Sequence, residues 1–91
     1  MDREEKVLKA LANKKRLIIL RILQDSGDGI NVKEIAKKIK LSERRTGKHL
    51  IKLESAGLIK KDRAGMFVIS RIPKQIAQIL QLLGKMFYRN K

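Results

Sequence analysis

Helix start signals are the feature that most constrains the fold of this chain. Four residues suited to the N-terminal cap of a helix each precede apolar residues at helical spacing, and they are Asp2, Asn13, Asn31 and Ser42. Asp2 with Glu5, and Asn31 with Glu34, also have the spacing of a capping box. Gly57 is typical of the position just after a helix. The pattern predicts four short helices, over about residues 2–12, 13–23, 32–39 and 42–56.

The apolar residues indicate how these helices pack. The second helix is apolar nearly all round, which predicts a central, buried helix. Its apolar residues are Leu17, Ile18, Leu20, Ile22 and Leu23. The third helix has an inward side made by Ile35, Ala36 and Ile39, and "QDSGDGI" before it predicts a turn. Two helices joined by a tight turn, the second strongly basic, form the helix-turn-helix pattern.

Beyond Gly57 the period of the sequence changes. The segment "LIKKDRAGMFVIS" predicts a β-hairpin, with a strand from Leu58, a charged turn at Asp62 to Gly65 and a strand from Met66 to about Ile72. Pro73 suits the first turn of a last helix. The expected fold is therefore mainly α with a β-hairpin, and no repeat or linker divides residues 1–91 into more than one domain.

The charge balance favours one class of partner. The chain has 23 Lys and Arg residues against 9 Asp and Glu residues, a formal net charge of +14. Such an excess favours polyanions, above all nucleic acid. A ribosome-associated protein or a lysine-rich thermophilic surface is the alternative, but thermophilic surfaces usually gain Glu together with Lys. Because Glu lags far behind here, we expect nucleic acid to be the partner.

The sequence lacks the residues that common catalytic and metal sites require. The chain has no cysteine, which excludes disulfides, thiolate zinc sites and cysteine nucleophiles. Its one histidine, His49, has no ligand-type neighbours at metal-binding spacing, and no catalytic constellation or phosphate loop occurs. We expect no enzyme activity, no cofactor and no metal effector. The charged start "MDREE" and the lack of an apolar run of about 18 residues indicate a soluble, cytoplasmic, nucleoid-associated protein without membrane contact.

Three segments resemble one family of regulators. "VLKALANKKRLIILRIL" resembles the opening of the arsenic-repressor-like (ArsR-type) winged helix-turn-helix transcriptional regulators, and "LSERRTGKHLIKLESAGLI" resembles their recognition segment. "KKDRAGMFVISRI" is similar to their wing and its last strand. The resemblance covers nearly the whole chain, although other winged helix families share the recognition motif. It implies a winged helix-turn-helix fold in the order helix-helix-helix-helix-hairpin-helix, with double-stranded DNA as partner.

The chain departs from the family pattern at three places. Metal-sensing members carry a cysteine pair in the helix before the turn, where this chain has "VKEIAKK". Others place His and carboxylate ligands in the last helix, and "PKQIAQILQLLGKMF" has neither. The known sensor ligands are therefore absent. The third departure is Gly47, which stands where a small polar residue is usual.

The basic helix over about residues 42–56 is the candidate recognition helix. Its N-terminal half would face base edges in the major groove, where Arg binds guanine bidentately and Ser or Thr reaches either kind of pair. Backbone contacts are expected from the start of the second helix and from the wing, whose tip carries three cations. The candidate DNA-binding residues are Lys14, Lys15, Arg16, Ser42, Glu43, Arg44, Arg45, Thr46, Gly47, Lys48, His49, Lys52, Lys60, Lys61 and Arg63.

Some of these residues have a structural alternative. Thr46 matches a core position of the family pattern. Gly47 serves either a close approach to DNA or tight helix packing. Arg16 makes either a phosphate contact or a structural salt bridge, and His49 lies on the helix surface or beside a phosphate. The wing cations are DNA contacts or solvated hairpin charge.

The last helix carries an apolar stripe wider than a monomer of this size needs. A domain this small buries only about 60–65% of its unfolded surface, so a second copy would help to stabilise it. We expect a homodimer in which the first and last helices face a two-fold mate, as the resemblance also implies. The candidate interface residues are Val7, Leu8, Leu11, Ile76, Ile79, Leu80, Leu83, Met86 and Phe87. Gly84 either ends the helix early or permits close crossing at the two-fold axis.

The expected function is sequence-specific binding of duplex DNA by a homodimer that regulates transcription, as a repressor. The recognition helix would enter the major groove, and the wing, over about residues 58–72, would lie on adjacent backbone or in the minor groove. Two alternatives stay open. One is a chromatin-like or RNA-binding protein that coats nucleic acid without sequence choice. The other is a winged helix that docks a protein partner on its apolar last helix.

Overall fold

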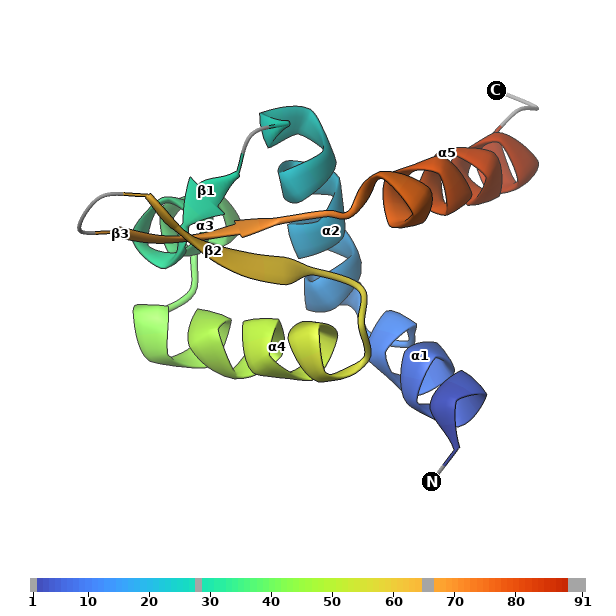
Figure 1. The fold of residues 1–91 in the computed structure, drawn as a ribbon, viewed down its shortest axis with the longest axis horizontal. Coiled ribbons are helices and arrows are strands. Elements are labelled where there is room, and N and C mark those ends of the chain that lie inside the picture. The colour runs from blue at the N-terminus through green and yellow to red at the C-terminus, as the bar shows by residue number, and fades with distance from the viewer. Residues whose placement is uncertain (1, 28, 65–66, 89–91) are drawn as a thin grey trace.

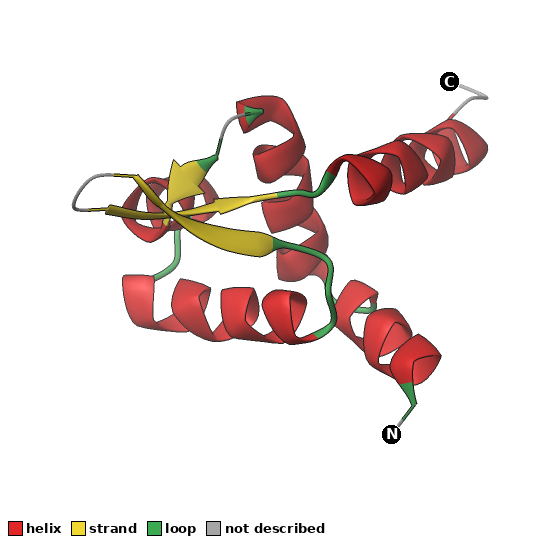
Figure 2. Cartoon of the chain, viewed as in Figure 1, coloured by secondary structure: helices red, strands yellow, loops and turns green. Residues whose placement is uncertain are grey.

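The computed structural model describes residues 2–27, 29–64 and 67–88. Their elements, in chain order, are α1 (Arg3–Leu11), α2 (Lys14–Ser26), β1 (Ile30–Asn31), α3 (Val32–Ile39), α4 (Glu43–Ser55), β2 (Lys60–Ala64), β3 (Phe67–Arg71) and α5 (Lys74–Tyr88). Helices dominate, and the strands form one small sheet beside α3 (Figures 1 and 2). The predicted class, mainly α with a β-hairpin wing, is confirmed.

The four predicted caps start the first four helices. In each case the cap side chain accepts a hydrogen bond from the backbone N–H three residues later, as the local chemistry of a helix start requires. The pairs are Asp2 with Glu5 (2.9 Å), Asn13 with Arg16 (3.1 Å), Asn31 with Glu34 (2.9 Å) and Ser42 with Arg45 (3.1 Å). Gly57 follows α4 with φ +78°, a conformation that glycine adopts without strain.

The sheet has three antiparallel strands in the order β1-β3-β2, one more than the hairpin expected. Gly29 permits β1 to approach β3, since a Cβ there would lie 2.9 Å from the side chain of Ile69. The charged turn predicted from Asp62 is wrong, because Asp62 and Arg63 lie within β2 and pair with Ile69 and Val68. Met66, predicted to begin the second strand, lies outside the described residues.

The core gathers where α2, α3, α4 and the segment before β2 meet (Figure 1). Its buried residues are Ala10, Ile19, Leu20, Leu23, Ile35, Ile39, Leu50, Leu53, Ala56, Leu58 and Ile59. Leu58 and Ile59 therefore serve as core residues, and the strand that was expected from Leu58 begins at Lys60. The turn predicted over "QDSGDGI" begins too early, since α2 continues to Ser26, and Asp28 lies outside the described residues.

Two further expectations need correction. The second helix is not buried on all sides, because Leu17 is 47% exposed and Ile18 is 37% exposed. Pro73 precedes α5, and its carbonyl accepts from the Ala77 N–H at 3.0 Å, so it occupies the cap position instead of the first turn. Both α1 and α5 project from the body of the molecule (Figure 1). None of the described helices combines the length and hydropathy that crossing a membrane requires.

Candidate nucleic-acid interface

The helix α4 has one buried face, made by Thr46, Leu50 and Leu53. Thr46 is fully buried, and its hydroxyl donates to the Ser42 carbonyl at 2.8 Å. A side chain in this position cannot reach DNA, so the assignment of Thr46 to the DNA-binding set is wrong and its core alternative is correct. This buried face fixes which side chains of α4 point outward.

The opposite face of α4 is basic and exposed. Ser42 and five charged residues of the helix point to solvent there, namely Glu43, Arg44, Arg45, Lys48 and Lys52. The ion pairs found among the described residues, Lys61 with Glu54 and Arg71 with Asp62, involve none of the four cations. Gly47 has no atom within 4 Å of where a Cβ would stand, so the tight-packing alternative is wrong. The structure thus brings the predicted recognition residues onto one open surface, apart from Thr46, which is buried, and His49, which is half-buried.

Arg16 is a structural residue. Only 8% exposed, it donates from Nε to the Ala10 carbonyl at 2.7 Å and from a terminal nitrogen to the Lys9 carbonyl at 3.2 Å. These carbonyls belong to the last turn of α1, where a cation is favoured. The phosphate contact predicted for Arg16 is wrong because its guanidinium is buried. Its hydrogen-bond partners are two backbone carbonyls and a ring nitrogen, so the structural alternative is correct, but without the salt bridge that it assumed.

The other guanidinium nitrogen of Arg16 reaches α4. It lies 3.4 Å from Nδ1 of His49, which is half-buried on the side of α4 that faces α2. Desolvation lowers the pKa of His49 below 6.5, and the nearby charges of Arg16, Lys52, Arg45 and Lys15 lower it further. A neutral imidazole can accept the hydrogen bond from Arg16, whereas an imidazolium cannot. His49 therefore belongs to the junction between α2 and α4.

The start of α2 continues the basic surface. Lys14 and Lys15 are exposed in the first turn of α2, and Lys15 lies close enough to His49 to act on its pKa. Lys15 therefore borders the basic face of α4, whereas Lys14 lines the hollow between α2 and α5. Backbone N–H groups at a helix start favour anions, and the lysines add positive charge at that point.

The wing cations lie along the hairpin instead of at its tip. Lys60 and Lys61 pair with Arg71 and Ser70 at the end of the hairpin nearest α4, and only Arg63 lies further out. Lys61 Nζ is 3.5 Å from the Glu54 carboxylate of α4, which ties the wing to that helix. The predicted tip position is therefore wrong for Lys60 and Lys61. Their role toward DNA stays a prediction.

Four lysines of the first helix-turn-helix element were missed as candidates. Lys33, Lys37, Lys38 and Lys40 are all exposed on or just after α3. In helix-turn-helix proteins the first helix crosses the DNA backbone, so these lysines are added to the candidate phosphate contacts. The signal was available in "VKEIAKKIK", because its lysines avoid the positions of the inward residues Ile35, Ala36 and Ile39.

The predicted dimer residues lie on α1 and α5. Leu8 is 65% exposed and Ile79 51% exposed, and Leu82, which was not predicted, is 61% exposed. Four others, Val7, Leu11, Ile76 and Leu80, pack partly against the core. Leu83 is half-buried, and the side chains of Met86 and Phe87 lie outside the described part. α5 runs through Gly84 to Tyr88, so Gly84 does not end the helix early.

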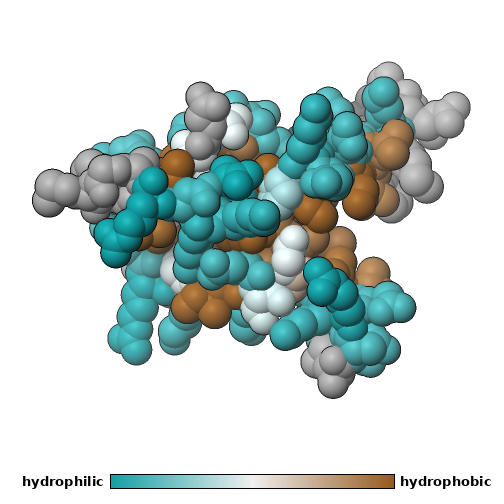
Figure 3. All heavy atoms as spheres, in the orientation of Figure 1, coloured by the Kyte–Doolittle hydropathy of each residue, from teal (hydrophilic) through white to brown (hydrophobic). Residues whose placement is uncertain are grey.

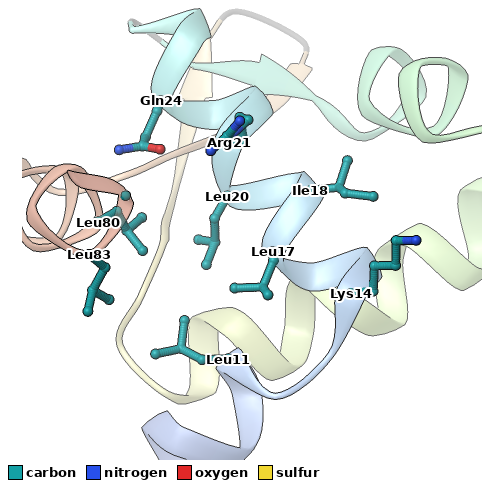
Figure 4. Close-up of a pocket in the computed structure, with 10 residues that line it drawn as sticks. Leu11, Lys14, Leu17, Ile18, Leu20, Arg21, Gln24, Leu80 and Leu83 are labelled. Atoms are coloured by element: carbon teal, nitrogen blue, oxygen red, sulfur yellow. The ribbon is translucent and has the colours of Figure 1, made fainter. Parts of the chain in front are cut away.

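An apolar hollow lies between α5 and α2. Its volume is about 540 Å³, and Figure 4 shows Leu80 and Leu83 of α5 facing Leu11, Leu17 and Leu20 across it. A second hollow of about 230 Å³ lies between α1 and α5. Apolar surface is visible between these two helices in Figure 3. Surface of this kind on a small domain marks an interaction site.

Within residues 2–27, 29–64 and 67–88, no three His, Asp or Glu side chains gather in a way that could hold a metal ion. The geometry therefore offers a charged surface and an apolar surface, on different parts of the molecule.

A sequence-family model of winged helix-turn-helix DNA-binding domains matches residues 12–60. This stretch contains α2, α3 and α4, the elements that form the basic surface. No protein of curated function matches the chain by sequence.

Solved structures of transcriptional regulators are similar over most of the chain. A homodimeric winged helix-turn-helix DNA-binding domain from Mycobacterium bovis, a possible ArsR-family regulator, is 31% identical with a TM-score of 0.87, and the match covers 93% of this chain and 78% of that one. HlyU from Vibrio cholerae is 27% identical with a TM-score of 0.79, covering 93% and 91%. The transcriptional repressor PagR of Bacillus anthracis is 27% identical with a TM-score of 0.76, covering 89% and 92%.

Proposed function

The chain belongs to the ArsR-like winged helix-turn-helix DNA-binding family, and from this premise we propose that it is a sequence-specific transcriptional repressor that binds duplex DNA as a homodimer. The observation that carries the proposal is the outward face of α4. A helix needs its buried face to fold, but nothing in this fold requires four cations on the other side. That face is available for the major groove.

The proposed docking follows from the positions of the charges. The N-terminal half of α4, with Arg44, Arg45 and Lys48, enters the major groove and contacts base edges. Lys14 and Lys15 on one side, and Lys60 and Arg63 of the wing on the other, hold the phosphate backbone. Ser42 offers its hydroxyl to the phosphate nearest the start of the helix.

The homodimer is supported by two observations. The Mycobacterium bovis relative is described as homodimeric. In this chain the apolar residues Leu8, Ile79 and Leu82 of α1 and α5 are more than half exposed, so the described residues do not cover them. A second copy related by a two-fold axis buries the same apolar surface on both chains.

Selection of duplexes from a random pool, followed by competition binding at two salt concentrations, tests this proposal. We expect enrichment of a two-fold symmetric motif, and an affinity for the selected duplex that exceeds that for random duplex by about 10³-fold or more. Equal affinity for both duplexes, with a steep salt dependence, would instead establish the non-specific coating function. Failure to bind any duplex would favour the protein-docking alternative.

A further inference from the structure

An isolated apolar residue lies in the middle of the basic face of α4. Ile51 is 58% exposed, while its neighbours Leu50 and Leu53 are buried. It follows Arg44 and Lys48 along the outward face, because positions 44, 48 and 51 are separated by four and three residues. Figure 3 shows apolar surface over α4 among hydrophilic side chains.

The fold itself gives Ile51 no role. Among the other exposed large apolar residues of the helices, Leu8, Ile79 and Leu82 lie on α1 and α5, where the proposed dimer covers them. Leu17 and Ile18 lie on α2, beside the apolar hollow. Ile51 lies on a different element, on the surface proposed to face DNA. A single exposed apolar side chain is common on protein surfaces. This one is distinguished by its place among the cations of the surface proposed to face DNA.

We propose that Ile51 recognises thymine in the major groove by packing against its 5-methyl group. This inference rests on the proposed function and names a specificity-determining residue for it. Among the groups that base pairs present in the major groove, the thymine methyl is the apolar one, and apolar side chains contact it. Lys52, the exposed residue after Ile51, holds a phosphate in this arrangement, while Ile51 and Lys48 face the bases.

Replacing thymine by uracil tests the contact, because uracil keeps the base-pairing edge and lacks only the methyl group. Starting from a selected duplex, each thymine is changed to uracil at symmetric positions, and the affinities of the wild type and of Ile51→Ala are measured. We expect one position where uracil weakens wild-type binding about fourfold per half-site, as loss of one buried methyl-sized group predicts. Ile51→Ala should lose the same factor on the thymine duplex and show no further loss with uracil.

Asp25→Ala is the control, since Asp25 is an exposed residue of α2 that belongs neither to the basic face of α4 nor to the proposed interface. Its uracil profile should equal that of the wild type. If Ile51→Ala also keeps the wild-type profile while a specific duplex is still selected, the thymine contact is refuted and the proposed function stands. If selection enriches no sequence, the proposed function fails and the thymine contact fails with it.

Discussion

Arg16 connects three helices through one guanidinium group. It is a residue of α2, it donates hydrogen bonds to two carbonyls at the end of α1, and it contacts His49 of α4. The last carbonyls of a helix have no partner within it, so a planar cation with several donors fits this position. Arg16 therefore sets how α1 meets the recognition helix.

We expect Arg16→Lys to destabilise the protein although it keeps the charge. One ammonium group cannot span the Lys9 and Ala10 carbonyls and His49 together, and lost buried hydrogen bonds to a charged group cost about 1–3 kcal/mol. Urea denaturation at neutral pH measures the loss. Lys15→Ala, at the exposed neighbouring position, should unfold at the wild-type midpoint. Identical midpoints for Arg16→Lys and the wild type would show that the network contributes nothing.

His49 makes the free energy of unfolding depend on pH. Its pKa in the fold lies below 6.5, first because burial penalises the charged ring and then because Arg16 and other cations surround it. As the pH falls below 6.5, the unfolded chain takes up the proton before the folded chain does, so stability decreases until the folded pKa is reached. His49→Gln, which still offers Arg16 an acceptor, should lose this decrease. The check is denaturation of both proteins between about pH 7.5 and 5.5, and parallel curves would contradict it.

At the scale of elements, α4 and the wing should contribute different kinds of binding. Replacing Arg44, Arg45 or Lys48 with Ala should mainly reduce preference for the selected duplex, by about 1–3 kcal/mol for any residue that holds a guanine. Replacing Lys60, Lys61 or Arg63 should weaken all duplexes alike and lower the log–log salt slope by about one unit each. Titrations of selected and random duplexes over a salt series separate the two effects.

Lys85→Ala is the control for these variants, since Lys85 is an exposed cation of α5, away from the basic face of α4. It should leave both the preference and the salt slope close to the wild type. If all six substitutions in α4 and the wing reduce affinity by the same factor on every duplex, α4 coats phosphates and does not read bases.

The sequence correctly predicted the helix ends that depend on residues close together in the chain. Ser42 caps α4 through an N–H only three residues away, and Gly57 ends the helix by its own backbone conformation. The errors lie where distant segments decide. Asp62 is a turn residue by type, but pairing with β3 and the ion pair with Arg71 place it in a strand.

The same limit applied to the site. The basic face of α4 followed from helical spacing alone, and so did the buried position of Thr46 as an alternative. The contact between Arg16 and His49 joins residues 33 positions apart, and no local sequence pattern predicts it. Leu17 and Ile18 were expected in the core because they are apolar. Burial depends on what covers a side chain, however, and an apolar hollow lies between α5 and this part of α2 (Figure 4).

At the scale of the whole molecule, the dimer can be tested without disturbing the monomer. Ile79 is 51% exposed, so Ile79→Glu should fold as a single chain, but its charge would be buried and costly in the dimer. We expect it to sediment at half the wild-type mass. Ile51→Glu, with a comparable exposure on α4, should keep the dimer mass. If Ile79→Glu also sediments as a dimer, the interface lies elsewhere.

The connection between α1 and α4 predicts that the spacing of the DNA site is fixed. If α1 and α5 form the interface, the contact of Arg16 with the end of α1 and with His49 holds each recognition helix in a set position relative to the two-fold axis. Two such helices on one face of the duplex require half-site centres about one helical turn, or 10–10.5 base pairs, apart, or a multiple of that spacing.

Inserting about five base pairs, half a helical turn, between the half-sites turns them to opposite faces of the duplex. Affinity should then fall to that of a duplex with one half-site, because the second helix cannot reach its groove. The same insertion placed outside both half-sites should change nothing. Full affinity with the central insertion would mean that each chain binds its half-site independently, and the dimer would then contribute nothing to recognition.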